Sequence, residues 1–214
     1  MWVCAASGII RAYSMKRTMD IVFAGAALLL LAPALAAVGI AIKLDSPGPV
    51  IFRQERVGRN FRRFWIYKFR TMIMDAAAKG PPITANADPR ITRVGSWLRW
   101  AKVDELPQLW NVLRGDMSLV GPRPELPRYV DRFQAEYREL LQVRPGLTDP
   151  SSLKYADEAR WLAGAADPEE LYVNRILPDK LALARRYVGR SSLRADAKLM
   201  ALTLLRICRR DDSR

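Results

Sequence analysis

The feature that most constrains this chain is an apolar run from Ile21 to Ile42 that contains no charged residue. As a straight helix, these residues would rise roughly 33 Å, enough to cross a hydrocarbon core of about 30 Å. A single transmembrane helix is therefore one interpretation. A secretory signal peptide is a second, although the run is long for the apolar region of such a peptide.

Two further features support a third interpretation, a re-entrant helical hairpin that enters and leaves the membrane on one face. Pro33, preceded by Ala32, lies near the middle of the run, where proline removes a backbone hydrogen bond and kinks a helix. Basic residues mark the cytoplasmic side of a membrane protein, and they flank the run at both ends. Those before it are Arg11, Lys16 and Arg17, and those after it are Lys43, Arg53, Arg56, Arg59, Arg62 and Arg63. The residues alone do not separate this hairpin from the simple span.

The charge balance predicts anionic partners. The chain has 35 Lys and Arg against 22 Asp and Glu, a net charge of +13, which suits nucleic acid, an acidic lipid surface or a phosphorylated small molecule. It has no histidine, so histidine-based triads and most zinc sites are excluded, and any acid–base or nucleophilic chemistry must use carboxylates, Lys, Tyr, Ser or Thr. The two cysteines, Cys4 and Cys208, give no disulfide framework and fit a reducing compartment.

Periodicity and turn residues predict a mostly helical remainder with one β-hairpin. Residues 50–72 favour a basic, aromatic hairpin around a turn at 58–60, and residues 75–95 favour a loop broken by short helix. A helical period returns at Ser96, and an amphipathic helix over 104–114 should end at Gly115. Stiff loops or turns are expected at 117–127 and 143–150, and further helices at 128–142, 168–172, 179–188 and 193–210. The last of these would cover the core or lie flat on an anionic membrane.

The adjacent acids Asp104 and Glu105 admit a structural and a functional interpretation. Asp is a preferred N-cap and acids are favoured in a first turn, so the pair could simply begin the helix over 104–114. The same position would keep Asp104 ionised through the helix N-terminus and nearby cations, as a nucleophile or a Mg²⁺ ligand requires. Neighbours on a helix diverge by about 100°, so the two acids need not share one role.

The segment GPRPE, residues 121–125, predicts a stiff anion-binding loop. Gly121 permits close backbone approach, and the flanking prolines restrict the chain on both sides of Arg123. A guanidinium held out by such a loop suits phosphate oxygens, although a plain surface turn with a salt bridge is the other interpretation. Four further cations are candidates to complete a phosphate pocket: Lys68, Arg70, Arg99 and Arg144. Several cations, two acids and no histidine together suit Mg²⁺-assisted phosphoryl chemistry.

Taken together, these residues resemble those of the bacterial sugar transferases, the small monotopic phosphoglycosyl transferases that act on polyprenyl (undecaprenyl) phosphate. The resemblance is collinear over most of the chain. It rests on residues 16–60, WIYKFRTM at 65–72, DPRITRVGSWLR at 88–99, VDELPQLWNVLRGDMSLVGPRPE at 103–125 and RPGLT at 144–148. No single motif would suffice, but their order and spacing are specific.

The resemblance implies a fold and a location. It implies a re-entrant membrane helix kinked at Ala32 and Pro33, with both ends cytosolic, on the bacterial inner membrane. It also implies an α/β catalytic domain of predominantly helical content, with a short β-hairpin and interfacial amphipathic helices. The expected segments are an N-terminal extension at 1–15, the membrane helix at 16–44 and the catalytic domain at 45–214.

The resemblance also implies a two-step reaction with Mg²⁺. Asp104 would attack the β-phosphorus of a UDP-sugar, expel UMP and carry the sugar-phosphate until polyprenyl phosphate accepts it, a first membrane step in a bacterial glycan pathway. Glu105 would assist metal binding or deprotonate the acceptor, while Lys68, Arg99 and Arg123 would hold phosphates. The implied partners are the UDP-sugar, the lipid acceptor and membrane lipid, without nucleic acid, and pairing of the chain with itself is left open.

Three departures from the family pattern matter. Ala32 stands where the family often has serine, so hydroxyl help at the kink is absent. The stretch DPSSLKYADEARWL, residues 149–162, replaces a common Gly-Trp-Ala-Gln-Val continuation and leaves sugar contacts there unassigned. Finally, Met15 is an alternative start to the chain. The strongest rival function is a membrane-anchored basic protein that binds nucleic acid or acidic lipid without catalysis.

Overall fold

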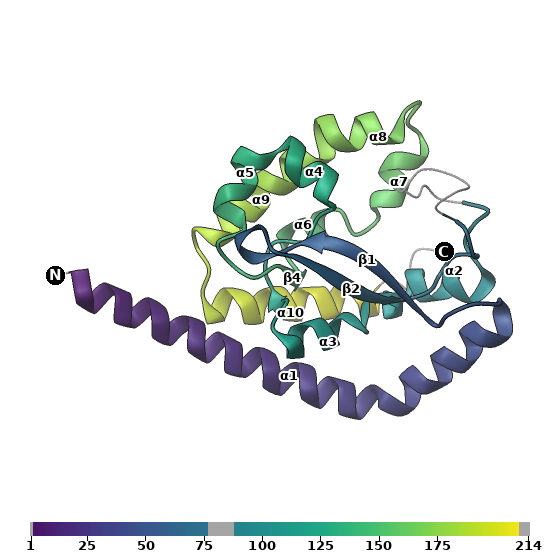
Figure 1. Ribbon diagram of the computed structural model, residues 1–214, viewed down its shortest axis with the longest axis horizontal. Coiled ribbons are helices and arrows are strands. Elements are labelled where there is room, and N and C mark those ends of the chain that lie inside the picture. The colour runs from purple at the N-terminus through teal and green to yellow at the C-terminus, as the bar shows by residue number, and fades with distance from the viewer. Residues whose placement is uncertain (1, 77–87, 210–214) are drawn as a thin grey trace.

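The structure is a computed structural model that describes residues 2–76 and 88–209. It is mostly helical, with a long N-terminal helix, one β-hairpin and a second pair of very short strands. In Figure 1 the long N-terminal helix runs along the bottom of the molecule, and most of the other helices lie above it. The predicted helical content and hairpin are confirmed. Much of the predicted loop at 75–95 lies outside the described residues.

The apolar run forms part of a single helix, α1, Trp2–Asp45, which contains both Ala32 and Pro33. Its residues Met15–Asp45 are long and apolar enough to cross a membrane, with a mean hydropathy of 2.5 and only 6% of the most apolar stretch buried in the protein. Figure 1 shows that α1 is bent rather than straight, and proline is the usual cause of such a bend. The structure thus has one bent helix where a hairpin of two helices was one expectation. It runs through the expected boundary between residues 15 and 16.

Both ends of the apolar run contact the rest of the protein. At the first end, Arg17 donates to the carbonyl oxygens of Val112 (2.6 Å) and Leu113 (2.9 Å), near the C-terminus of α3, Gln108–Arg114. At the other end, Arg70 donates to the carbonyl oxygens of Ser46 (2.6 Å) and Pro47 (2.8 Å). Between these anchors α1 packs against α3 through a cluster of buried apolar side chains that includes Ala24, Leu109 and Val112.

The predicted β-hairpin is present as β1, Ile51–Val57, antiparallel to β2, Arg63–Phe69. The turn between them is a short 3₁₀ segment, Arg59–Phe61, that places Asn60 and Phe61 at positive φ. Buried Asn111 of α3 ties this hairpin to the helix, because its side chain donates to the carbonyl of Trp65 (2.7 Å) and accepts from the amide of Tyr67 (3.1 Å). The next residue along β2 is Lys68, so this contact fixes its position.

The prediction of one helix over 104–114 is wrong. Helix α2, Arg93–Trp100, is followed by Lys102 in a left-handed conformation (φ 58°) and a separate 3₁₀ turn, η2, Val103–Glu105. Helix α3 begins only at Gln108, after Pro107, and has no side-chain N-cap. Its end is as expected, with Gly115 at φ 88°. Asp104 and Glu105 therefore lie in a turn of their own and do not cap α3.

The expected loops at 117–127 and 143–150 contain two short strands. Strand β3, Ser118–Val120, pairs in parallel with β4, Gly146–Thr148. The backbones then approach closely, as expected for Gly121: a Cβ there would lie 2.5 Å from the carbonyl oxygen of Arg144, and a Cβ on Gly146 would lie 2.0 Å from the amide of Gly121. This contact holds the start of the GPRPE segment against the loop that leads to α6.

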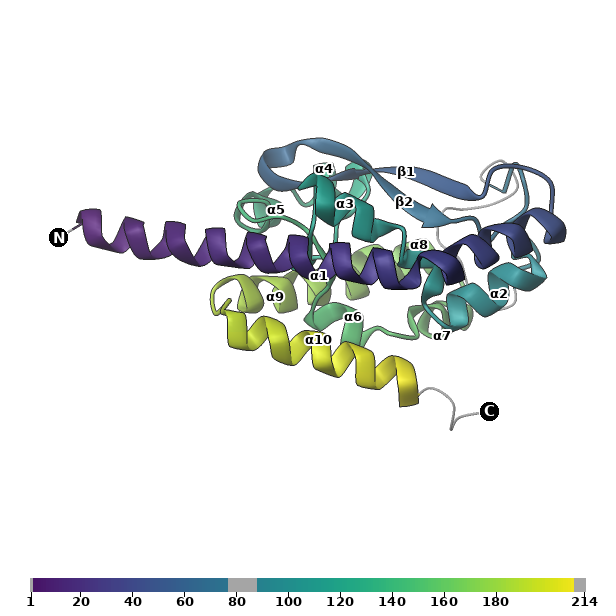
Figure 2. The ribbon, with the colours of Figure 1, turned by 90° about the horizontal axis from the view of Figure 1, so that it is seen from below.

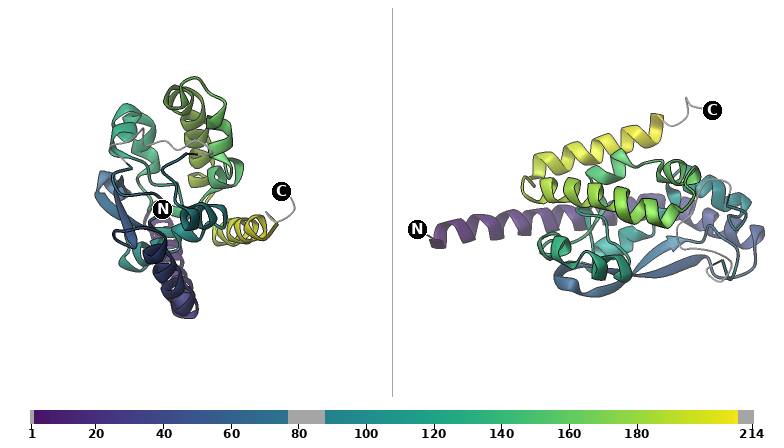
Figure 3. Two further views of the ribbon diagram at one scale, coloured as in Figure 1. Left: turned by 90° about the vertical axis from the view of Figure 1, so that its right-hand side faces the viewer. Right: turned by 90° about the horizontal axis from the view of Figure 1, so that it is seen from above.

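The C-terminal half is a set of short helices around the largest buried apolar cluster. The expected helix over 128–142 is divided near Phe133 into α4, Pro127–Arg132, and α5, Gln134–Leu140. The predicted helices near 168, 179 and 193 are confirmed as α8, Pro168–Leu171, α9, Leu177–Val188, and α10, Leu193–Cys208. The remaining elements are α6, Pro150–Lys154, α7, Glu158–Ala163, and a π-helical turn, η3, Tyr172–Ile176. Figure 3 shows the teal helices α4 and α5 beside the blue hairpin and the yellow helix α10 on the side away from it.

Candidate active site

The turn η2 opens onto a large cleft with a volume of about 1850 Å³. One part of the cleft is polar and includes four of the predicted site residues together with Glu105: Lys68, Arg99, Asp104 and Arg123. Another part is apolar and is lined by side chains of α1 and α10: Phe23, Ala27, Leu31, Met200, Leu204 and Ile207. Figure 2 shows α1 and α10 together on the lower face of the molecule. The cleft therefore joins a charged site to an apolar surface.

Asp104 is buried, with 9% of its surface exposed, and its Oδ1 has no hydrogen-bond partner among the residues that the structure describes. Burial raises the pKa of its carboxyl group, and the adjacent charge of Glu105 raises it further, against the opposing charges of Lys68, Lys102 and Arg99. The sequence predicts that a helix N-terminus helps to keep Asp104 ionised, and the structure provides none there, because Asp104 lies in η2 and does not cap α3. The expected cations are present and favour the ionised form, but burial and Glu105 oppose them.

Glu105 has the opposite environment. Its Oε1 accepts from Lys68 Nζ at 2.9 Å, and its carboxylate also accepts from both terminal nitrogens of Arg123, with Nη1 lying 3.2 Å from Oε2. Although burial opposes ionisation, the charges and hydrogen bonds of Arg123 and Lys68 hold the pKa of Glu105 well below its usual range. Glu105 in turn raises the pKa of Arg123. The acid therefore ties β2 to the GPRPE segment.

Arg123 lies in the cleft as predicted, but its guanidinium is paired with Glu105 and is not held out alone. About a third of its side chain, 35%, remains exposed. A guanidinium that is fixed on one side by a carboxylate and open on the other can still donate hydrogen bonds to a phosphate oxygen.

Arg99 is the third cation beside Asp104. It projects from α2, and its Nε donates to the hydroxyl of Thr71 at 2.9 Å. Burial lowers its pKa, while the charges of Asp104 and Asp88 raise it. Thr71 follows the hairpin and was not singled out from the sequence, because a lone threonine in a basic segment carries no pattern.

Two predicted phosphate ligands are engaged elsewhere. Arg70 is buried and donates to the backbone at the end of α1, including the carbonyl oxygen of Ser46 at 2.6 Å. It borders the cleft, but its guanidinium stabilises the end of a helix. Arg144 is absent from the lining of the cleft and borders a separate small cavity with Lys16 and Arg17, where its Nε donates to the carbonyl oxygen of Gly115 at 2.9 Å. Burial lowers the pKa of Arg144.

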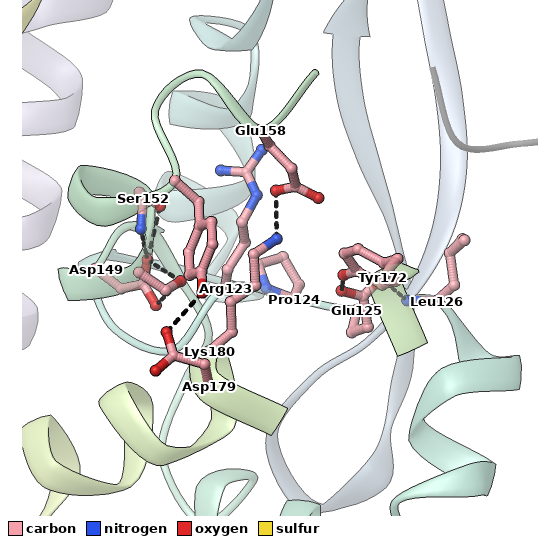
Figure 4. Close-up of polar contacts among 12 residues, drawn as sticks. Arg123, Pro124, Glu125, Leu126, Asp149, Ser152, Glu158, Tyr172, Asp179 and Lys180 are labelled. Atoms are coloured by element: carbon pink, nitrogen blue, oxygen red, sulfur yellow. Dashed lines mark hydrogen bonds and ion pairs between the residues drawn. The ribbon is translucent and has the colours of Figure 1, made fainter. Parts of the chain in front are cut away.

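The structure adds cleft residues that the sequence did not indicate. They come from the 149–162 stretch and from α9, and they include Ser152, Glu158 and Lys180 (Figure 4). Asp149 is buried and caps α6, because it accepts from the amide of Ser152 at 2.8 Å and from the hydroxyl of Ser151. The Asp-Pro pair that begins α6 is a sequence signal for such a cap, whereas the place of Glu158 in the cleft depends on tertiary packing.

Such a site can support attack by a carboxylate on an anionic, phosphorylated substrate. Asp104 offers an oxygen without a partner, and Lys68, Arg99 and Arg123 supply positive charge within the same cleft. Among the described residues, no group of three or more His, Cys, Asp or Glu side chains could hold a metal ion by itself. Mg²⁺, however, commonly binds one or two carboxylates together with substrate phosphates. Asp104 and Glu105 could provide the carboxylates.

Comparison with known proteins places the chain among sugar-phosphate transferases. The family model for bacterial sugar transferase matches residues 11–210. A UDP-glucose:undecaprenyl-phosphate glucose-1-phosphate transferase of Caulobacter vibrioides is 43% identical over 194 residues, covering 88% of this chain and 68% of that protein. The exopolysaccharide production protein PSS of Rhizobium leguminosarum bv. phaseoli is 40% identical over 198 residues, covering 89% of this chain and 94% of that protein.

The name of a third relative contains a different sugar. It is a UDP-N-acetylgalactosamine-undecaprenyl-phosphate N-acetylgalactosaminephosphotransferase of Aeromonas hydrophila, 49% identical over 138 residues, or 62% of this chain. This chain spans about a third of the length of that protein, since the match covers 32% of it.

Proposed function

Since the chain belongs to the bacterial sugar transferase family, we propose that it transfers a sugar-1-phosphate from a UDP-sugar to undecaprenyl phosphate or a related polyprenyl phosphate and releases UMP. The observation that carries the proposal is the cleft itself. It holds Asp104, whose Oδ1 accepts no hydrogen bond from a described residue, and the cations Lys68, Arg99 and Arg123 line the same cleft. The names of the relatives in Caulobacter vibrioides and Aeromonas hydrophila support undecaprenyl phosphate as the acceptor.

The first step is attack by the Asp104 carboxylate on the β-phosphorus of the donor. A bond forms between an Asp104 oxygen and phosphorus, the bond from phosphorus to the bridging oxygen breaks, and UMP leaves with that electron pair. A raised pKa makes this carboxylate more basic and therefore a better nucleophile once it is ionised. The cations Lys68, Arg99 and Arg123 neutralise charge on the phosphoryl oxygens as it develops.

In the second step, an oxygen of the lipid phosphate attacks the same phosphorus. Its bond to Asp104 breaks, the carboxylate is regenerated, and the product is a polyprenyl diphosphate sugar. The apolar part of the cleft, between α1 and α10, supports this step because a polyprenyl chain needs an apolar path to the phosphorus.

The residues present fit a magnesium ion. Asp104 would hold the ion through Oδ1, which is buried and accepts no hydrogen bond from a described residue. Glu105 could also reach the ion, but both of its carboxylate oxygens already accept hydrogen bonds from Lys68 or Arg123. When bound, the ion would neutralise charge on the diphosphate. The pKa of Glu105 lies far below the operating range of a general base, so we assign this residue to fixing Lys68 and Arg123 rather than to deprotonating the acceptor.

We further propose that α1 enters the membrane and that both its ends stay on the cytoplasmic side of the inner membrane. The support is that Arg17 and Ser46, at opposite ends of the apolar run, both bond to the same body of protein. A straight span would separate these ends by about 30 Å of hydrocarbon. Helices α1, α3 and α10 lie in the lower half of Figure 1, and their exposed apolar side chains would lie in the lipid: Leu29, Leu30, Ile40, Trp110, Leu204 and Leu205.

This topology can be tested with single cysteines placed near Ser14 and near Ser46, after Cys4 and Cys208 have been replaced. An impermeant thiol reagent is applied to oriented membrane vesicles. Labelling of both positions from the cytoplasmic face is expected, and labelling from opposite faces would establish a simple span instead.

The activity can be tested by UMP release from a panel of UDP-sugars with Mg²⁺ and undecaprenyl phosphate in detergent or nanodiscs. UDP-glucose and UDP-N-acetylgalactosamine are the first donors to try, because relatives carry those sugars in their names. At least one donor should release UMP, and Asp104→Asn should release none. A chain that binds nucleic acid with a steep salt dependence, and is indifferent to Asp104→Asn, would instead be the non-catalytic rival.

A further inference from the structure

Part of the segment that departs from the family pattern, residues 149–162, lines the same cleft as η2. Helix α7 begins at Glu158, and the cleft lining includes this residue along with Tyr155 and Arg123. Figure 4 shows the side chains of Arg123 and Lys180 extending toward Glu158. An acidic side chain thus borders the same space as the cations that we assign to phosphate binding.

Glu158 is held in place by a lysine that is itself fixed. Lys180 Nζ donates to Glu158 Oε2, and only 12% of the lysine side chain is exposed. The ammonium also lies over the rings of Tyr172 (4.9 Å) and Tyr155 (5.8 Å). The other carboxylate oxygen of Glu158, Oε1, has no hydrogen-bond partner among the residues that the structure describes, and 30% of the side chain is exposed. Glu158 therefore presents a positioned acceptor to the cleft.

The charges around Arg123 separate two ends of the polar site. Glu105 is the main cause of the raised pKa of Arg123, and the charges of Asp149 and Glu158 add to it. A carboxylate repels phosphate oxygens but is a strong acceptor for hydroxyl groups. The space next to Glu158 therefore favours the hydroxyl-bearing part of a nucleotide-sugar, and the space next to Lys68 and Arg99 favours the diphosphate.

We propose that Glu158 binds a sugar-ring hydroxyl of the donor and contributes to donor specificity. This inference rests on the proposed function. The hydroxyl belongs either to the transferred sugar or to the ribose of the nucleotide, and both present the same chemistry to a carboxylate. Glu158 does not touch the reacting phosphorus, so its contribution should appear in KM and not in kcat.

The test compares steady-state UMP release and calorimetric binding for the wild type and Glu158→Ala in full-length protein with Mg²⁺. Loss of a charge-assisted hydrogen bond predicts an increase in donor KM of roughly tenfold or more, with kcat within about twofold. Glu158→Gln keeps an acceptor oxygen and should recover part of the loss. Weaker binding of the UDP-sugar with unchanged binding of UDP assigns the contact to the transferred sugar, whereas equal weakening of both assigns it to the ribose.

Two controls exclude indirect effects. Glu139→Ala removes an exposed acid that pairs with Arg185 outside the cleft, and it should leave donor KM unchanged. The double variant Glu158→Ala with Lys180→Met removes the lysine that Glu158→Ala would leave unpaired. If KM returns to the wild-type value in the double variant, the loss came from that lysine and the proposal is wrong.

The inference can fail without the proposed function. If the wild type releases UMP and Glu158→Ala matches it in donor KM and in UDP-sugar binding, Glu158 has no role in the donor site, and the transferase activity stands. If the wild type neither binds nor turns over any UDP-sugar, the proposed function fails and takes this inference with it.

Discussion

The basic side chains around Glu105 and those near the two ends of the α1 apolar run differ in what they bond. Around Glu105, Lys68 and Arg123 pair with a side-chain carboxylate and border the cleft. Near the ends of the run, Arg17 and Arg70 donate to backbone carbonyl oxygens at helix ends. Carbonyls at a helix end have few intrahelical partners, so a cation that binds them stabilises the helix end, whereas a carboxylate partner can share its cation with a phosphate. The group that a cation contacts therefore distinguishes a cation that anchors the fold from one that can bind a substrate phosphate.

Among these cations, substitution of Arg123 should have the largest effect on activity. Arg123→Met should lower kcat/KM for UMP release by about 10²- to 10³-fold, because it removes a forked donor at the developing phosphoryl charge. Arg123→Lys retains the charge but loses the forked pair of donors, so its kcat/KM should lie between those of Arg123→Met and the wild type. A kcat/KM within twofold of wild type for Arg123→Met would place this residue with the anchoring cations.

Arg70 should show the reverse pattern. Arg70→Met should lower the free energy of unfolding by about 2–4 kcal/mol, because several buried carbonyl acceptors lose a charged donor. The donor KM of the folded protein should remain near the wild-type value. Thermal unfolding and donor KM measured on the same preparation check this, and a large KM increase at unchanged stability would return Arg70 to the phosphate pocket.

The pH dependence of the reaction tests the electrostatic role of Lys68. Asp104 must be ionised to attack, and its pKa is raised from an ordinary value of 3.8, so the acid limb of the kcat profile should lie above that pH. The charge of Lys68 opposes this increase. Lys68→Met should therefore shift the acid limb to higher pH, and a shift to lower pH would contradict the assignment.

The smallest effect is expected from Arg144. Arg144→Met removes one hydrogen bond to the carbonyl of Gly115, outside the cleft, and should cost about 1 kcal/mol of stability. Its donor KM and kcat should stay within twofold of wild type. An increase in KM comparable to that of Arg123→Met would bring Arg144 back into the donor site and weaken the division between the two groups.

Local sequence signals predicted the local structure. Alternation and turn residues indicated the β-hairpin, Gly115 indicated the end of α3, and Gly121 indicated a close backbone approach. The prediction failed at η2, because the left-handed conformation of Lys102 is unusual for a residue with a side chain and has no pattern in the sequence. Strands β3 and β4 have three residues each and are stabilised by pairing with one another, so neither is visible alone.

The site was predictable as a set of residues and not as a geometry. Asp104, Arg99, Arg123 and Lys68 do share a cleft, but Arg70 and Arg144 have the same charge and are engaged elsewhere. Their partners are set by tertiary packing, as is the approach of Glu158 to Arg123, and no spacing along the chain encodes either.

The central claim, that Asp104 is the nucleophile, is tested most directly by mass spectrometry of the intact protein and of its peptides, without the lipid acceptor. Wild-type protein is mixed with Mg²⁺ and a UDP-sugar that it accepts as a donor. It should release about one equivalent of UMP and gain the mass of one sugar-phosphate on the peptide that carries Asp104. Asp104→Asn should show neither. The same burst and the same adduct in Asp104→Asn, or turnover by the wild type that requires the acceptor and never yields an adduct, would contradict the account.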